Sequence, residues 1–264
     1  MQLLQLPTDL KNKGLSYLLI YGKAHPRIPE YVCEMASGIG LILRNFFVKR
    51  CNMNNKKHGY KRDAHLFVFD TMSDWEASYA IAGINNPQFQ KNPDIYRMRT
   101  VALRKTSVVS IGGMRIQPDL TLDELSSTSS AMLIIPGGTA WDEGKNIEAV
   151  DIARAFLSDS TPVAAICGAT AGLARGGLLD IRRHTSNSRE YLAATHYLGE
   201  NLYEDKPAVT DNCLITASAM APVDFAYHIF KCLDIYSTPV LEAWYGLFKT
   251  GRAEYFGALM KAIK

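Results

Sequence analysis

The sequence predicts an α/β fold with a doubly wound, mostly parallel sheet that is covered by helices on both faces. Short uncharged apolar runs such as HLFVF, AMLII and PVAAI are typical of strands buried on both faces of a parallel sheet. Amphipathic helical patterns alternate with these runs, as they do in doubly wound sheets. The 264 residues are 47% hydrophobic, which is enough to form a sizeable core and argues against a disordered chain.

Residues 1–63 differ from the rest of the chain in charge. They hold 11 Lys and Arg against 4 Asp and Glu, whereas the whole chain holds 29 against 26. Segment 44–62 interleaves basic and aromatic side chains, a pattern that nucleic acid or an anionic membrane can bind. We interpret 1–63 as a loosely ordered basic extension with neither partner, ahead of one α/β domain at 64–264. Nucleic-acid or membrane binding, or a true start at Met53, are the alternatives.

The first elements of the domain are predicted from HLFVFD, which begins just after Ala64 and forms a buried strand. A helical pattern follows over Asp74–Ile84. Two β-rich runs within residues 100–118 flank Gly112 and Gly113, where a positive φ comes easily. This arrangement predicts a strand and a hairpin or bulge near a sheet edge.

The second half of the domain continues the alternation. AMLIIPGG predicts a buried strand, NIEAVDIARAFLSD an amphipathic helix, and TPVAAICGATAGLARGGLLD a strand, a sharp turn and a helix that closes at two glycines. PAVTD and CLITAS predict two short strands. Helices are predicted over Pro222–Leu233 and Pro239–Phe248, each with proline in its first turn.

Unusual residues follow three of these strands directly. Glu76 ends the DTMSDWE segment after the first strand, Gly137 and Gly138 follow AMLIIP, and Cys167 and Gly168 follow PVAAI. Ligands of such sheets bind beyond the carboxyl ends of the strands. We therefore expect a carboxylate, a diglycine and a cysteine to meet at one edge of the sheet.

Cys167 is the candidate nucleophile. It lies where a strand turns into a helix, so the unsatisfied N–H groups of the helix start would surround its sulfur. That setting favours the thiolate and is expected to lower the pKa of Cys167. The N–H groups of Gly168 and Gly138 are the candidate donors of an oxyanion hole. The alternative is a small apolar cysteine packed under a Gly/Ala-rich helix.

Glu76 is the candidate partner of that sulfur. A protonated carboxyl donates to a thiolate, whereas an ionised one repels it, so we expect the two groups to titrate as a coupled pair. The neighbouring Trp75 is expected to exclude water from them. The alternative is a solvent-facing carboxylate in the first turn of a helix.

Three motifs, the AICGATAG turn, the LIIPGG strand end and the DWE loop, resemble the ThiJ/PfpI group of the class I glutamine amidotransferase-like superfamily over residues 64–235. The resemblance implies a flavodoxin-like sandwich and a homodimer. It also implies Cys167 as nucleophile on a strained elbow, Glu76 hydrogen-bonded to its sulfur, and Gly138 and Gly168 as the oxyanion hole. The HTSN stretch and the C-terminal segment SAMAPVDFAYHIFKCLD are similar to a bacterial branch usually labelled glutamine amidotransferase-like or protease.

The third catalytic group departs from the family pattern. The best-known branch has a histidine twenty residues after its cysteine; that position here is Asn187, and the nearest histidine, His184, lies at seventeen. His184 transfers protons if a loop shift brings it into reach, whereas Asn187 can orient a substrate but cannot transfer protons. Arg182 and Arg183 flank His184, so a basic surface is the alternative for this residue.

Two activities of the superfamily lose support from the motifs. Its intracellular peptidases have a histidine directly after the nucleophile, where this chain has Gly168, and its glutaminases have a His-x-Glu pair that neither His196 nor His228 begins. We therefore expect a cysteine-dependent enzyme for small reactive carbonyls, through hemithioacetal formation with glyoxals, proton transfer and hydrolysis. The rival hypothesis is a non-catalytic thiol redox sensor or stress protein, because a reactive thiol beside a carboxyl is prone to oxidation. Glutaminase and peptidase remain weaker alternatives.

The remaining composition predicts a cytoplasmic protein that needs no metal or cofactor. Five cysteines without a C-x-x-C pair argue against a disulfide scaffold or a zinc ribbon and suit a reducing compartment with at least one free thiol. Cys213 and Cys232 fall in strand and helix patterns and are expected in the core. No metal-ligand spacing, P-loop or 18-residue apolar run occurs. We expect a small-molecule substrate and no membrane span.

Overall fold

The computed structural model describes residues 62–263 as a mostly parallel sheet flanked by helices. The expectations for the basic extension and for a start at Met53 lie outside the described residues. The described strands, in chain order, are β1 Arg62–Phe67, β2 Tyr96–Ala102, β3 Val108–Val109, β4 Arg115–Ile116, β5 Leu120–Thr121, β6 Met132–Ile135, β7 Val163–Ile166, β8 Ala208–Asp211 and β9 Leu214–Ala217.

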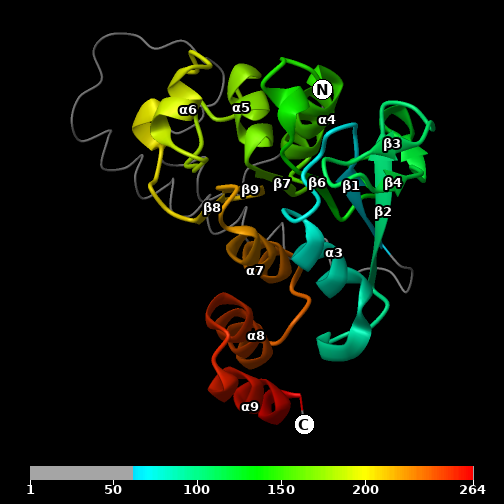
Figure 1. Ribbon diagram of the computed structural model, residues 1–264, viewed down its shortest axis with the longest axis vertical. Coiled ribbons are helices and arrows are strands. Elements are labelled where there is room, and N and C mark those ends of the chain that lie inside the picture. The colour runs from blue at the N-terminus through cyan, green and yellow to red at the C-terminus, as the bar shows by residue number, and fades with distance from the viewer. Residues whose placement is uncertain (1–61, 264) are drawn as a thin grey trace, which may run out of the picture. The chain divides into compact units, whose positions relative to one another are not determined.

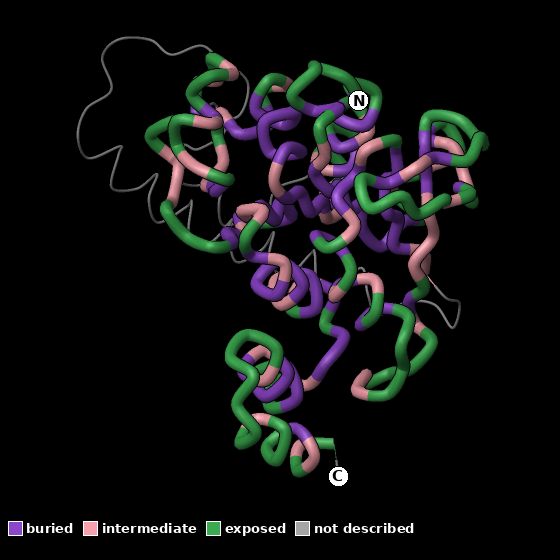
Figure 2. Tube along the Cα trace, viewed as in Figure 1, coloured by how far each residue is buried: buried purple, intermediate pink, exposed green. Residues whose placement is uncertain are grey.

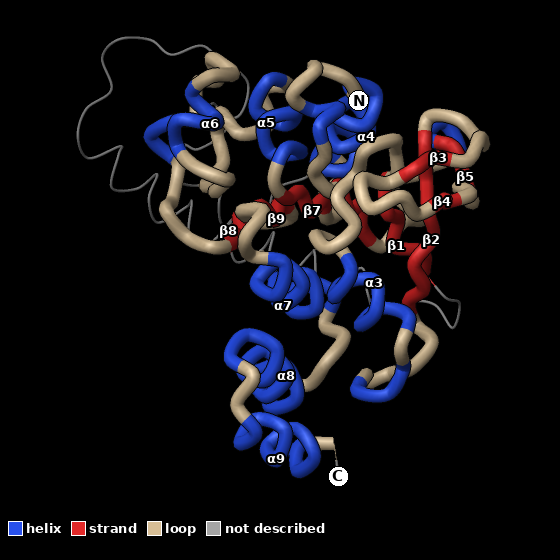
Figure 3. Tube along the Cα trace, viewed as in Figure 1, coloured by secondary structure: helices blue, strands red, loops and turns tan. Residues whose placement is uncertain are grey.

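Seven of these strands form one sheet in the order β5-β2-β1-β6-β7-β9-β8. Every neighbouring pair is parallel except β8 and β9. β3 and β4 form a separate antiparallel hairpin, as the two glycines between them predicted, and Gly113 in its turn has a φ of 84°. The predicted doubly wound, mostly parallel sheet is therefore confirmed (Figure 3).

Helices cover both faces of the sheet. Figure 1 shows α4 and α5 on one face and α3 and α7 on the other, with α8 and α9 packed beyond α7. In the described part of the chain, the α-helices are α3 Ser78–Asn85, α4 Ile147–Ser158, α5 Gly168–Arg175, α6 Arg189–Ala193, α7 Pro222–Leu233, α8 Thr238–Thr250 and α9 Ala253–Ala262. The short 3-10 helices of this part are η3 Pro87–Phe89, η4 Leu122–Glu124, η5 Thr139–Trp141 and η6 Glu200–Leu202.

The core lies between these layers, where the central strands are buried along their whole length (Figure 2). Trp141, Phe156, Phe225 and Phe230 are each at most 1% exposed. Burying an aromatic or aliphatic side chain of this size stabilises a fold by about 1.5–3 kcal/mol relative to leaving it exposed. The site described below therefore stands on a rigid platform.

Two helices differ from the prediction. A helix was predicted over Asp74–Ile84, but it begins only at Ser78. The residues before Ser78 are bound instead to the hairpin and to the diglycine. The Gly112 N–H donates to Asp74 at 2.7 Å, and Met72 forms an isolated antiparallel β-bridge with Gly138. The short helix α6 was not predicted at all. By contrast, α7 begins and ends at the predicted residues.

Cysteine burial also differs in part from expectation. Cys167 and Cys232 have free thiols and are partly buried. Cys213 is 7% exposed, as predicted for a core residue, but it is disulfide-bonded.

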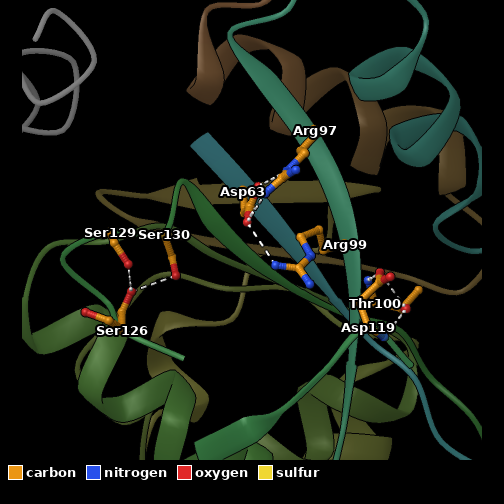
Figure 4. Close-up of polar contacts among 8 residues, drawn as sticks. All are labelled: Asp63, Arg97, Arg99, Thr100, Asp119, Ser126, Ser129 and Ser130. Carbon is orange, nitrogen blue, oxygen red and sulfur yellow. Dashed lines mark hydrogen bonds and ion pairs between the residues drawn. The ribbon is translucent and has the colours of Figure 1, made fainter. Parts of the chain in front are cut away.

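The amino ends of β1 and β2 carry a surface ion cluster, drawn in Figure 4. The Arg97 guanidinium donates to Asp63, and Arg99 lies 3.5 Å from the same carboxylate. Within the part of the chain described, no helix is long and apolar enough to cross a membrane.

Candidate active site

Cys167 occupies a strained elbow between β7 and α5. Its φ of 59° and ψ of −128° lie in a region that residues with a side chain rarely adopt. Two neighbours hold it there: its N–H donates to the Ala217 carbonyl at 3.0 Å, and its own carbonyl accepts the Thr170 hydroxyl at 2.6 Å. The predicted sharp turn is thus present, and it directs the Cys167 side chain away from the regular path of the strand.

The start of α5 packs closely against Trp141 and the diglycine segment. A Cβ on Gly168 would lie 3.1 Å from the Trp141 Cβ and 3.2 Å from the Gly138 carbonyl oxygen. Trp141 itself is fixed by its indole N–H, which donates to the Pro136 carbonyl at 2.9 Å. The two glycines predicted to form an oxyanion hole therefore lie side by side next to Cys167.

Gly137 lies beside both the sulfur of Cys167 and the carboxyl group of Glu76. A Cβ on Gly137 would lie 2.8 Å from both Cys167 Sγ and Glu76 Oε2. The Gly137 N–H donates to that same Oε2 at 2.5 Å. Only a residue without a side chain leaves the thiol and the carboxyl facing each other across this point.

The segment that carries Glu76 is bound to the diglycine by backbone contacts. The Ser73 N–H donates to the Gly137 carbonyl at 2.9 Å. Gly138 has a φ of 154°, and a Cβ there would come within 2.5 Å of the Thr71 carbonyl. Glu76 is consequently 1% exposed, although Trp75 beside it is 50% exposed and does not shield it as predicted.

The thiol does not have the lowered pKa that the helix start predicted. Burial raises the pKa of Cys167 to about 11, and the charge of Glu76 adds to the rise. The Asn187 side chain and the Gly168 N–H lower the pKa, but they do not outweigh burial. The expectation of a thiolate in the free site is therefore wrong, because the helix start is only one of several groups that act on the sulfur.

The carboxyl of Glu76 is shifted in the same direction. Burial raises the pKa of Glu76, while the Gly137 N–H, the Cys167 thiol and the Ser73 side chain lower it part of the way. Its Oε1 is buried without a hydrogen bond of ordinary geometry. Glu76 and Cys167 thus form a buried pair in which a negative charge on one disfavours a negative charge on the other.

Asn187 lies at the sulfur. Its Nδ2 is 3.5 Å from Cys167 Sγ, and its Oδ1 accepts the Ala219 N–H at 2.9 Å. The position found by counting twenty residues from the cysteine therefore does contact the nucleophile.

His184 does not join this group. It is fully buried, with Nδ1 at 2.7 Å from the Arg182 carbonyl and Nε2 at 3.0 Å from the Tyr197 hydroxyl. Both ring nitrogens are therefore used elsewhere, and burial lowers the pKa of His184. Neither the proposed proton transfer at Cys167 nor the alternative of a basic surface fits this position.

The sequence interpretation missed Tyr191 and Asp142, which are joined by a hydrogen bond of 2.7 Å. The Cys167 charge is among the groups that raise the pKa of Tyr191, so this phenol lies within electrostatic reach of the sulfur. A signal was available in the sequence, because Ser188 is a good helix N-cap just after Asn187.

Solved and curated proteins resemble this chain over different shares of its length. The crystal structure of a ThiJ/PfpI family protein from Bacillus anthracis is 42% identical in sequence and has a TM-score of 0.73. The match covers 78% of this chain and 99% of that protein. The Bacillus subtilis protein named Uncharacterized protease YoaZ is 42% identical over 205 residues, which are 76% of this chain and 98% of that protein. The Pyrococcus furiosus protein named Deglycase PfpI is 30% identical over 101 residues, 38% of this chain and 61% of that protein.

The similarity to the solved structure agrees with the flavodoxin-like sandwich that the motifs implied. The DJ-1/PfpI family model matches residues 62–232, from the first strand of the sheet to the end of α7. That range contains the elbow, the diglycine and the buried carboxyl. The chain belongs to the DJ-1/PfpI family.

Proposed function

We propose that this protein is a cysteine-dependent enzyme that converts small reactive carbonyl compounds, with glyoxals as its substrate class. One observation carries the proposal: a buried carboxyl, Glu76, and a free thiol, Cys167, face each other across Gly137. A thiol with a raised pKa needs a base at the moment of attack. Glu76 is placed to be that base.

The first step moves the proton of the Cys167 thiol to Glu76. At rest the sulfur is protonated, because burial raises the pKa of Cys167 to about 11. When an aldehyde carbon comes within reach, the proton moves from Sγ to Glu76 and a bond forms between the sulfur and that carbon. The carbonyl electron pair moves to the oxygen, near the N–H groups of Gly138 and Gly168. The oxygen takes up a proton, and the product is a hemithioacetal.

The second step moves hydrogen within the substrate. Glu76, ionised again once it has given its first proton to that oxygen, takes the proton from the former aldehyde carbon and delivers it to the neighbouring carbonyl carbon. The hydroxyl proton moves from the first oxygen to the neighbouring carbonyl oxygen, so that the first carbon regains a carbonyl. This gives a thioester of Cys167, which water hydrolyses to a 2-hydroxy acid and the free thiol. The net change is addition of one water to the glyoxal, so the reaction needs no external oxidant or reductant.

The named relatives support the proposal to different degrees. A protein named as a deglycase is consistent with chemistry on carbonyl adducts, although it matches only part of this chain. A protein named as a protease covers the domain, yet Gly168 stands where a catalytic histidine would follow the nucleophile. The redox-sensor hypothesis is weakened by the raised pKa of Cys167, because the thiolate is the form that peroxide oxidises.

The test is turnover of methylglyoxal by the purified full chain. We expect the wild type to convert it to lactate and Cys167→Ala to lose at least about 1000-fold in rate, since removal of a nucleophile typically costs that much or more. Cys232→Ser is the matched control, because it removes a free thiol from α7 and should leave the rate unchanged.

Equal consumption of methylglyoxal by the wild type and by Cys167→Ala would contradict the proposal. Glutamine and a peptide substrate are assayed in parallel. Cys167-dependent release of glutamate or of peptide fragments, without methylglyoxal turnover, would establish the glutaminase or the peptidase alternative instead.

A further inference from the structure

A hydrogen bond between Tyr191 and Asp142 connects the two chain segments that border the sulfur. The Tyr191 hydroxyl donates to Asp142 Oδ1 at 2.7 Å. Asp142 directly follows η5, the short helix after the diglycine, whereas Tyr191 lies in α6, just after Asn187. The proposed chemistry uses neither residue, so the bond needs another explanation.

Tyr191 is held as a neutral donor close to the site. Burial raises the pKa of Tyr191, and the hydrogen bond and charge of Asp142 raise it further, followed by the charge of Cys167. Its ring packs against the hydrophobic core as Cys167 also does. The phenol therefore keeps its proton at neutral pH and keeps donating to Asp142.

The other side-chain attachment of α6 leads away from the sulfur: the Arg189 guanidinium donates to the Glu200 carbonyl at 2.8 Å and lies over the Tyr203 ring. α6 has five residues, and only Leu192 among them is buried. Asn187 is exposed, and its Nδ2 lies 3.5 Å from Cys167 Sγ, an ordinary length for a hydrogen bond to sulfur. An outward shift of α6 would lengthen this contact.

Tyr191 is coupled to Asn187 through the start of the helix. The Tyr191 N–H donates to the Ser188 hydroxyl at 3.1 Å, and Ser188 is the residue that follows Asn187. Asn187 has one further anchor, the Ala219 N–H at 2.9 Å. The position of the Asn187 side chain thus depends on both contacts.

We propose that the Tyr191–Asp142 hydrogen bond is a latch that holds Asn187 against the sulfur of Cys167, which makes Tyr191 a positioning residue for the nucleophile. Asn187 donates to the sulfur and stabilises its ionised form. Opening the latch lets Asn187 withdraw, and the sulfur then ionises less readily. The Ala219 contact remains, so the loss is partial.

The experiment measures the reactivity of Cys167 directly, by its rate of alkylation with iodoacetamide between pH 6 and 10, followed by peptide mass spectrometry on the full chain. Tyr191→Phe removes only the hydroxyl, and Asp142→Ala removes the acceptor. We expect both to slow alkylation about three- to tenfold below pH 9, which is less than the full loss of a hydrogen bond to a charged group would cause, because the Ala219 contact still holds Asn187. The profile should move to higher pH.

Two variants separate the latch from general loosening or a charge effect. Asp142→Asn keeps an acceptor oxygen, and we expect it to retain the wild-type profile. Tyr227→Phe breaks a matching bond, because the Tyr227 hydroxyl donates to Glu242 at 2.6 Å between α7 and α8, and it should change nothing. A wild-type profile for Tyr191→Phe would overturn the latch, and so would equal shifts in Tyr191→Phe and Tyr227→Phe.

A double-mutant cycle tests the route through Asn187. In an Asn187→Ala background, Tyr191→Phe should have no further effect on alkylation. A full additional loss in that background would show that Tyr191 acts on the sulfur without Asn187 and would overturn the inference. Alkylation needs no substrate turnover, so this result is independent of whether glyoxals are the substrates.

Discussion

Two carboxylates at opposite ends of the sheet have opposite environments. Asp63 lies at the amino end of β1, where its side chain is 19% exposed and paired with Arg97 and Arg99 (Figure 4). Burial by itself would raise the pKa of Asp63, but the two arginines outweigh it and lower the pKa. Glu76 lies beyond the carboxyl end of β1, is 1% exposed, and has its pKa raised by burial.

The difference lies in the partners rather than in burial alone. The partners of Glu76 are a backbone N–H, a thiol and a hydroxyl, none of which carries a positive charge. The cations at Asp63 fix that group as an anion, which suits a structural ion pair. Without a cation, Glu76 keeps a raised pKa, which makes it a stronger base than an ordinary carboxylate.

The largest effect that tests this comparison is expected for Glu76→Gln. It removes the base, so glyoxal turnover should fall about 100-fold or more. It also removes the charge that contributes to the raised pKa of Cys167, so alkylation of the thiol at pH 7 should become faster. Asp63→Asn, the matched change at the other end of the sheet, should alter neither rate. A Glu76→Gln variant that loses both turnover and thiol reactivity would show that Glu76 serves only to keep the site folded.

A second effect concerns Gly137, which keeps the pair in contact. In Gly137→Ala the new Cβ would stand 2.6 Å from the Cys167 Cβ and 2.8 Å from both reacting groups, so one of them must move. Displacement of a reacting group by about 1 Å can cost about 100-fold in rate. The unfolding free energy should fall by about 1–3 kcal/mol, as for other overpacked sites. Turnover and urea denaturation measure the two losses.

The control for that variant is Gly257→Ala in α9, where a Cβ meets nothing within 4 Å. It should leave turnover unchanged and stabilise the helix by up to about 1 kcal/mol. If Gly137→Ala behaves like this control, the thiol and the carboxyl do not need the close approach that the structure shows.

The strands and the elbow could be predicted because their signals are local. AMLII and PVAAI are buried strands in the structure as in the prediction, and α7 begins at Pro222, whose fixed φ suits a first turn. Asn187 was found by counting twenty residues from Cys167, which gives the matching position only when no insertion or deletion lies between them. The predicted proximity of Glu76, Gly137 and Cys167 followed from the rule that parallel strands place their carboxyl ends at one edge.

The electrostatics of the site could not be predicted in the same way. The pKa of Cys167 depends on burial and on a carboxylate from a segment about ninety residues earlier in the chain, and both outweigh the local helix start. α6 is too short to show a periodic pattern, and although Ser188 marks its start, nothing in the sequence connects Tyr191 to Asp142. His184 lies near the expected spacing, but packing directs its ring to Tyr197 instead.

The smallest effect is the pH dependence of stability at the two ends of the sheet. The lowered pKa of Asp63 means that its contribution is present above the unfolded-state value and is lost as pH falls through the folded-state value. Asp63→Asn should therefore cost up to about 1 kcal/mol at pH 7, as for a partly exposed ion pair, and nothing once pH has fallen below the folded-state value. The raised pKa of Glu76 gives the opposite sign, because its contribution is present below the unfolded-state value and is lost as pH rises through the folded-state value. Glu76→Gln should accordingly gain stability relative to the wild type as pH rises above the unfolded-state value. Urea denaturation at a series of pH values measures both differences, and a common sign for the two variants would show that the two carboxylates do not differ as the comparison requires.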